Sequence, residues 1–202
     1  IYCEQLGLIA TQWLNIITNV GFVFFAILAI WYIQKQSSAK WRDYLLATLL
    51  SCIGIGSFLW HTFPASWSDY ADTISIIVFA LVALVFVVRK IFRSPIVQTF
   101  VVIISACIGL YLEQLPYING SLPYVFLLVL MAGVSFYFLK KNSDASRNFK
   151  NASFLFTIGI IARSIDMYVC DILEVGTHFI WHILVAWMGY YLILGIHRLS
   201  RS

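Results

Sequence analysis

The sequence contains little charge. Asp, Glu, Lys and Arg make up 11% of its 202 residues, while hydrophobic residues make up 61%. Soluble domains contain roughly 25% charged and roughly 45–50% apolar residues, so a globule of this size could not hide so much apolar surface. The composition excludes an ordinary cytosolic enzyme, a disordered tail and a small secreted domain held by disulfides. It predicts a protein embedded in a membrane.

Other features that the sequence lacks narrow the class of protein further. The Lys and Arg residues form no basic tract and no basic–aromatic stripe, so we expect no nucleic-acid partner. There is no internal repeat and no low-complexity segment. The first apolar stretch has no basic region before it and contains Asn15 and Asn19, which argues against a cleaved signal peptide. The chain begins at Ile1 rather than at methionine, so we expect that further residues precede it.

Apolar stretches account for most of the chain. A membrane-spanning helix needs about 20 mostly apolar residues, and runs such as 76–88 lack the period of two that marks transmembrane strands. Gly54 and Gly56 predict a close contact between two helices. Because the loops are too short for a second domain, residues 1–202 are expected to form a single all-α domain, an integral membrane bundle of seven transmembrane helices. The stretches are 12–34, 43–61, 70–88, 96–113, 121–139, 150–170 and 177–196.

The basic residues predict the direction of the chain. Twelve of the 13 Lys and Arg fall after the first, third and fifth stretches or in the C-terminal tail, and the exception is Arg163. Loops rich in Lys and Arg remain in the cytoplasm, so the N-terminus is expected outside and the C-terminus in the cytoplasm. The twelve residues are Lys35, Lys40, Arg42, Arg89, Lys90, Arg93, Lys140, Lys141, Arg147, Lys150, Arg198 and Arg201.

Five polar residues fall at the opposite, outer end of the predicted bundle. Ser57 and His61 are four residues apart and therefore share one face of a helix, as do His178 and His182. Asp72 follows at the start of the third stretch. The directions of the stretches place all of them at a similar depth. Ionisable residues within a membrane are costly and mark functional sites.

The three histidines predict a metal site. Three imidazoles with one open position are a common catalytic zinc set, and two histidines four apart on a helix can hold one ion. Imidazole suits zinc, copper, iron or nickel better than calcium or magnesium, and zinc needs no redox partner. The alternative is that each histidine forms hydrogen bonds between helices.

Two further pairs of residues each have two interpretations. Asp166 either orients a ligand histidine through its second ring N–H or forms an ion pair with Arg163, three residues before it. Cys3 and Cys170 both fall at the outer end. If that side is oxidising they can form a disulfide, and otherwise they remain free thiols.

Taken together, these residues resemble the alkaline ceramidase family. The similarity covers nearly the whole chain, with the motifs in the same order and in matching spans. The wider superfamily, which also contains the adiponectin and progestin receptors, combines Ser-x-x-x-His, an Asp and His-x-x-x-His in a seven-helix membrane protein. The motifs of this chain are Tyr2-Cys3-Glu4, Asn15-Ile16-Ile17-Thr18-Asn19, Ser57-x-x-x-His61, Asp72, Asp166-x-x-x-Cys170 and His178-x-x-x-His182.

The resemblance implies a zinc-dependent intramembrane hydrolase that cleaves the amide bond of ceramide or a related N-acyl lipid. It places Asp72 next to the attacking water and Ser57 next to the reacting carbonyl, and it favours a disulfide between Cys3 and Cys170. The partners are then the lipid substrate and membrane lipids, and no obligate protein partner is evident. The zinc ligands that the resemblance implies are His61, His178 and His182.

The chain also departs from the family pattern. Members with a calcium site carry several acids in the N-terminal segment, whereas here Glu4 remains but Ile1 and Gln12 stand where acids are expected. This argues against calcium at Glu4. The short loops resemble a bacterial member, for which we expect the inner membrane with the site facing the periplasm. In a eukaryote we expect an ER or Golgi membrane with the site facing the lumen.

Two other functions suit a seven-helix chain. A lipid receptor or sensor would hold a structural zinc closed by four protein ligands, with Asp72 or an outer cysteine as the fourth. A transporter would carry polar residues along a path through the bilayer, but the inner halves of the stretches are apolar and no repeat is evident. The hydrolase is the prediction, and the receptor or sensor is its alternative.

Overall fold

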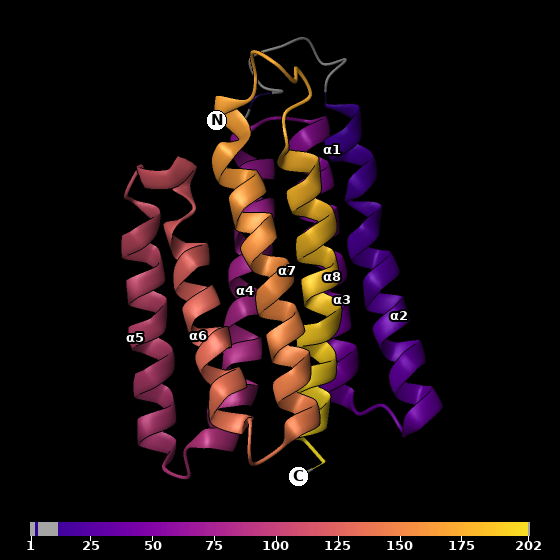
Figure 1. The fold of residues 1–202 in the computed structure, drawn as a ribbon, viewed down its shortest axis with the longest axis vertical. Coiled ribbons are helices and arrows are strands. Elements are labelled where there is room, and N and C mark those ends of the chain that lie inside the picture. Colours follow the sequence, from indigo (N-terminus) through magenta and orange to yellow (C-terminus); the bar gives the residue numbers. More distant parts are fainter. Residues whose placement is uncertain (1–2, 4–11, 202) are drawn as a thin grey trace.

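The computed structural model describes residue 3 and residues 12–201, and this part of the chain contains helices and no strand (Figure 1). Each apolar stretch of the sequence forms a helix, and the first is divided into α1 and α2 at Asn19. The elements are α1 (Trp13–Thr18), α2 (Val20–Gln36), α3 (Trp41–Thr62), α4 (Ser66–Ile91), α5 (Pro95–Glu113), the short 3₁₀ helix η3 (Tyr117–Gly120), α6 (Leu122–Phe138), α7 (Ser143–Ile165), the 3₁₀ turn η4 (Asp166–Tyr168) and α8 (His178–Leu199).

Five helical segments of the described chain are long and apolar enough to cross a membrane. They are α1 with α2, then α3, α4, α5 and α8. Helix α6 is apolar but has 17 residues. The part of the chain that the structure describes is therefore helical, with helices apolar enough for the membrane protein that the composition predicts.

The sixth stretch differs most from the prediction. Helix α7 begins seven residues before the expected start at 150 and ends at Ile165 rather than at 170. The Asn142 side chain accepts a hydrogen bond from the Ala145 backbone N–H at 3.0 Å and caps the first turn. Hydropathy alone assigns this polar first turn to a loop. The turn has no apolar periodicity, and the only sign that it is helical is the capping residue Asn142.

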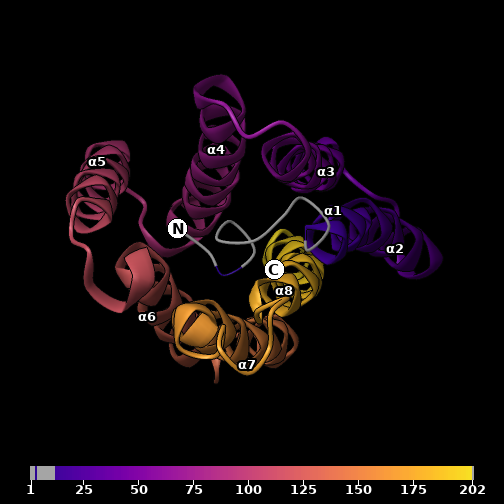
Figure 2. The ribbon, with the colours of Figure 1, turned by 90° about the horizontal axis from the view of Figure 1, so that it is seen from above.

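Helix α8 lies at the centre of the bundle (Figure 2). It contacts α1, α2, α3, α4 and α7, whereas α5 packs mainly against α4 and α6 and has no buried residue. The connections after α2, α4 and α6 lie at the same end as the C-terminus (Figure 1). The other end carries the α3–α4 and α7–α8 connections, so the end of α3 and the start of α8 lie at the same end of the bundle.

A close contact between α3 and α4 depends on Gly56. A Cβ atom at this position would lie 2.6 Å from the backbone oxygen of Ala71 and 3.0 Å from the Cα atom of Asp72. Gly54 allows a similar approach on another face, where a Cβ would lie 2.8 Å from the backbone oxygen of Asn19. Both glycines thus serve the helix contacts predicted for them, and the first brings Ser57 beside the turn that carries Asp72.

We expect Gly56→Ala to destabilise the fold by about 1–3 kcal/mol, because the added methyl group overpacks a backbone contact. Gly133→Ala is the matched control, since a Cβ there has no atom within 4 Å among its neighbours. It should be neutral or slightly stabilising. Thermal unfolding of the two variants in detergent checks this, and equal midpoints would contradict the assigned contact.

Candidate metal site

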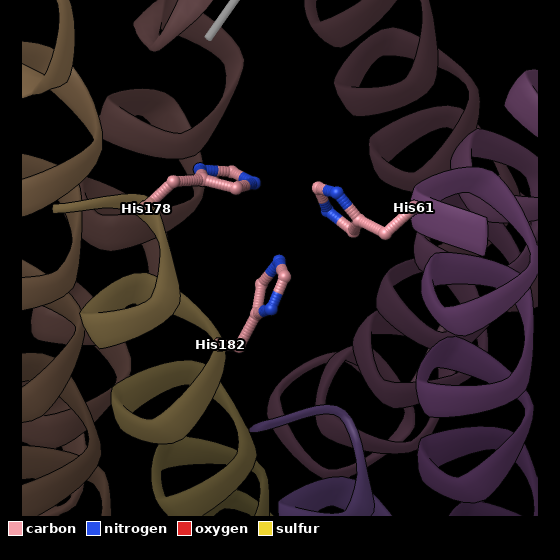
Figure 3. A group of neighbouring side chains, drawn as sticks. All are labelled: His61, His178 and His182. Atoms are coloured by element: carbon pink, nitrogen blue, oxygen red, sulfur yellow. The ribbon is translucent and has the colours of Figure 1, made fainter. Parts of the chain in front are cut away.

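Three histidines meet at the end of the bundle where α8 begins. His61 is the penultimate residue of α3, and His178 and His182 occupy the first two turns of α8. All three are buried, with exposed fractions of 4%, 3% and 2%. Their candidate ligand nitrogens lie within 4.8 Å of one another, and the rings point toward a common centre (Figure 3). The distance between ring centroids is 4.6 Å for His178 and His182.

In two of these rings, the nitrogen that points away from the common centre, here called the outer nitrogen, faces an oxygen acceptor. His61 Nδ1 lies 2.9 Å from Gln12 Oε1, and His182 Nδ1 lies 3.2 Å from the backbone oxygen of Asn15. Thr18 Oγ1, 3.1 Å from His182 Nδ1, donates to the Leu14 backbone oxygen and can accept from the ring. Carbonyl oxygens only accept, so these contacts assign the ring hydrogen to Nδ1 and leave Nε2 with its lone pair. This is the arrangement in which metal-binding histidines are held.

Asp166 fixes the start of α8. Its side chain is fully buried, and Oδ1 accepts hydrogen bonds from the backbone N–H groups of Thr177 at 2.6 Å and His178 at 3.0 Å. A carboxylate at a helix N-terminus satisfies free N–H groups and opposes the positive end of the helix dipole. Asp166 therefore positions His178 through its backbone, a role that neither of the two sequence interpretations of Asp166 names.

A disulfide joins the N-terminal segment to the same region. Cys3 and Cys170 are bonded, with Cα atoms 5.5 Å apart. The Cys3 backbone N–H donates to Asp166 Oδ2 at 2.8 Å. Gly176 has a φ of +62°, and a Cβ at this position would lie 2.8 Å from the Cys3 Cβ and collide with the Asp166 carboxylate. The Asp166 carboxylate thus holds residue 3, the α7–α8 connection and the start of α8 together through hydrogen bonds.

Ser57 and Asp72 line a cavity of about 540 Å³ together with His178 and His182. Asp72 Oδ1 is buried and has no hydrogen-bond partner among the residues that the structure describes. Toward the opposite end of the bundle the lining becomes apolar. It reaches Leu192, ten residues after His182 on α8 and therefore roughly 15 Å further along the helix axis. The deep lining residues are Leu50, Ala83, Val87, Phe149, Met188 and Leu192.

Arg163 also lines this cavity. Its guanidinium carbon lies 5.0 Å from the ring centroid of Tyr124 and 5.5 Å from that of Trp181, within the range of cation–π contacts. Its backbone oxygen accepts from the Asn119 side chain at 3.2 Å. Arg163 thus connects the end of α7 to the η3 turn and to two aromatic walls of the cavity.

Sequence reasoning missed Gln12 as a partner of His61. Gln12 stands where the family pattern suggests a calcium-binding acid, yet its side chain bonds a histidine of the predicted zinc set. Glu4, the remaining calcium candidate, lies outside the described residues. A polar residue at the first position of the first apolar stretch is the only sequence signal for Gln12, and it does not identify a partner far along the chain.

The site belongs to the class of buried three-histidine centres that open onto an apolar cavity in a membrane protein. The donor set fits a metal ion that prefers nitrogen ligands, because three imidazoles converge and the outer nitrogens of two of them are held by oxygen acceptors. His61, His178 and His182 would hold such an ion, and three imidazoles are a usual ligand set for zinc.

The chain belongs to the Ceramidase family, whose model matches residues 2–202. It is therefore a hydrolase that acts on the amide bond of ceramide, as the sequence resemblance predicts. A comparison with curated proteins finds no significant match.

We expect each of His61→Ala, His178→Ala and His182→Ala to lose a bound metal ion, because each removes one of three converging ligands. His197→Gln, near the other end of α8, should retain it. Metal content by mass spectrometry, on protein never exposed to chelator or a nickel column, checks this beside a thermal unfolding curve for each variant. Equal metal content in all four folded variants would exclude this site.

Gln12→Ala should weaken metal binding about 10–100-fold, the usual effect of removing a partner that orients a ligand histidine. Gln12→Glu keeps an oxygen acceptor for His61 Nδ1 and should stay closer to the wild type. Competition with a chelator of known affinity measures both variants. Unchanged affinity in Gln12→Ala would show that the contact does not orient the ligand.

Proposed function

We propose that the chain is a zinc-dependent hydrolase that cleaves the amide bond of ceramide or a related N-acyl lipid at the three-histidine site. The observation that carries the proposal is the placement of this site. His178 and His182 lie at the polar end of a cavity that Ser57 and Asp72 also line, and the lining becomes apolar toward the opposite end of the bundle. The polar head of a lipid matches the polar end of this cavity, and its acyl chain matches the apolar end.

His61, His178 and His182 would hold the zinc ion through Nε2, with Gln12 and Asn15 keeping two of the rings in orientation. When bound, zinc supplies Lewis-acid activation of water and of the amide carbonyl. Zinc is preferred because imidazole is among its usual ligands and hydrolysis requires no change of oxidation state.

Asp72 is the proposed general base. Its Oδ1 atom is buried beside the cavity without a hydrogen bond from the described residues, so it can accept the proton of an attacking water. The water oxygen forms a bond to the amide carbon, the carbon–nitrogen bond breaks, and Asp72 transfers the proton to the departing amine. The products are a carboxylic acid and an amine, and the carboxylate of Asp72 is regenerated.

Ser57 is the proposed donor to the carbonyl oxygen. It is buried on α3 one turn before His61, and its hydroxyl can donate a hydrogen bond as negative charge develops on that oxygen. Arg163 has a positioning role, since it packs on Tyr124 and Trp181 at the cavity wall. The deep apolar part of the cavity would hold the acyl chain.

The proposed topology is a single domain of seven membrane crossings with the N-terminus outside. The basic loops and the C-terminus share one end of the bundle (Figure 1), and loops of this kind remain in the cytoplasm. The Cys3–Cys170 disulfide lies at the other end, with the histidines, and disulfides persist in oxidising compartments. Both observations support a site that faces the periplasm or, in a eukaryote, the ER or Golgi lumen.

Asp72→Asn should retain zinc and lose about 10²–10⁴-fold in turnover of ceramide, because the amide cannot take the proton. Asp69→Asn, one turn earlier on the same helix and exposed, is the matched control. Release of free amine from ceramide, measured with zinc content for each variant, tests the proposal. Wild-type turnover in Asp72→Asn would remove Asp72 from the mechanism, and no turnover by the zinc-loaded wild type on any N-acyl lipid would refute the function.

A further inference from the structure

The fourth histidine of the chain lies far from the metal site. His197 follows His182 by fifteen residues on α8, roughly 22 Å along the helix axis. It is buried, with 3% of its surface exposed. Its two ring nitrogens face two different polar side chains, one from the start of α3 and one from the residue after α2.

These contacts form a chain of three side chains. Asp43 Oδ2 lies 2.9 Å from His197 Nδ1, and His197 Nε2 lies 3.0 Å from Ser37 Oγ. A carboxylate accepts only, so the ring hydrogen belongs on Nδ1 and Nε2 is left to accept from the serine hydroxyl. Serine, histidine and aspartate therefore have the order and the tautomer found in serine hydrolases, which are recognised by this geometry and not by chain order.

We propose that Ser37, His197 and Asp43 form a second catalytic site, in which Ser37 is a nucleophile toward carboxylic esters of lipids at the membrane surface. The proposal does not depend on the metal site or on its function.

The histidine and the aspartate are held in place while the serine is accessible. The fully buried Asp43 also accepts from the Lys40 backbone N–H at 2.8 Å, and the Ser200 hydroxyl donates to the His197 backbone oxygen at 2.7 Å. Ser37 itself is half-buried in the connection that follows α2. A fixed base beside an accessible hydroxyl is what a nucleophilic serine requires.

A donor for the reacting oxygen stands next to the serine. Ser38 is exposed, and its backbone N–H donates no hydrogen bond to any residue that the structure describes. The residue after the nucleophile supplies such a donor in α/β-hydrolases. The nearby cations favour lipid esters as the substrate class. Lys35 lies in the last turn of α2 and Lys40 directly before α3, and basic groups at a membrane end attract anionic lipid heads.

The proposed reaction balances without a cofactor. Ser37 Oγ attacks the ester carbonyl carbon while its proton passes to His197 Nε2, and that proton then leaves with the alcohol. Water attacks the resulting acyl-serine, gives its proton to His197 and releases the carboxylic acid with the serine restored. Asp43 stabilises the imidazolium in both steps.

Labelling of the intact protein in detergent with a fluorophosphonate probe tests this site. We expect one phosphonyl adduct, mapped to Ser37 by peptide mass spectrometry, that is absent in Ser37→Ala and present in Ser38→Ala, which keeps the backbone donor. Asp43→Asn should slow labelling at least tenfold. Hydrolysis of p-nitrophenyl butyrate should fall to background in Ser37→Ala and persist after metal chelation.

Each other outcome decides against the proposal. If Ser37 of the folded wild type carries no adduct, or if Ser37→Ala is labelled as fast as Ser38→Ala, the three side chains only tie the ends of α2, α3 and α8 together. Asp43 is buried and supports the fold, so its variant is not the deciding one. The comparison of Ser37→Ala with Ser38→Ala decides the test. Labelling of Ser37 in His178→Ala separates this site from the metal site, so that failure of either proposal leaves the other standing.

Discussion

The position of α8 depends on one buried carboxylate. Asp166 accepts hydrogen bonds from the backbone of Cys3, Thr177 and His178, so it joins the N-terminal segment and the α7–α8 connection to the first residue of α8. Three hydrogen bonds to an ionised group are strong ones. Helix α8 is the central helix and carries two histidines of the site. A shift in the position of its first residue would therefore displace the metal ligands and the cavity wall together.

The burial of the three imidazoles is the second constraint. A buried polar group is tolerated when it is hydrogen-bonded or holds a metal. In this chain the outer nitrogens of His61 and His182 meet oxygen atoms of the segment Gln12–Thr18. Residues Gln12–Thr18 therefore link α3 to α8 through the two rings, and Cys3 is tied to the same end of the bundle by its disulfide with Cys170. The site needs residues that are far from its ligands in sequence.

Much of the fold follows from the sequence, because length and hydropathy are local properties. All seven apolar stretches are helical, and the ends of most lie within a few residues of their predicted limits. Helix α7 is the exception, since its first turn is polar and depends on the cap at Asn142. The convergence of His61, His178 and His182 was also predictable, since the spacing of four and the alternating directions of the helices are enough to bring them to one depth.

The supporting residues could not be predicted in the same way. Gln12 contacts His61, which lies 49 positions later in the sequence, and Asp166 bonds backbone groups whose positions depend on a turn at Gly176. The contact of Ser37, His197 and Asp43 joins residues that are 154 and 160 positions apart, without a motif to connect them. Such contacts depend on how the helices pack against one another. The spacing of residues in the sequence predicts only which of them share one face of a helix.

X-ray absorption at the zinc edge of the purified, zinc-loaded protein tests the central claim most directly. The proposed hydrolase site predicts three histidine nitrogens at about 2.0–2.1 Å, no sulfur ligand and a fourth position that the protein leaves open. A zinc ion closed by four protein ligands, whether with Asp72 or with a cysteine, would indicate a structural ion and would contradict the account of this site as the place where the lipid amide is cleaved.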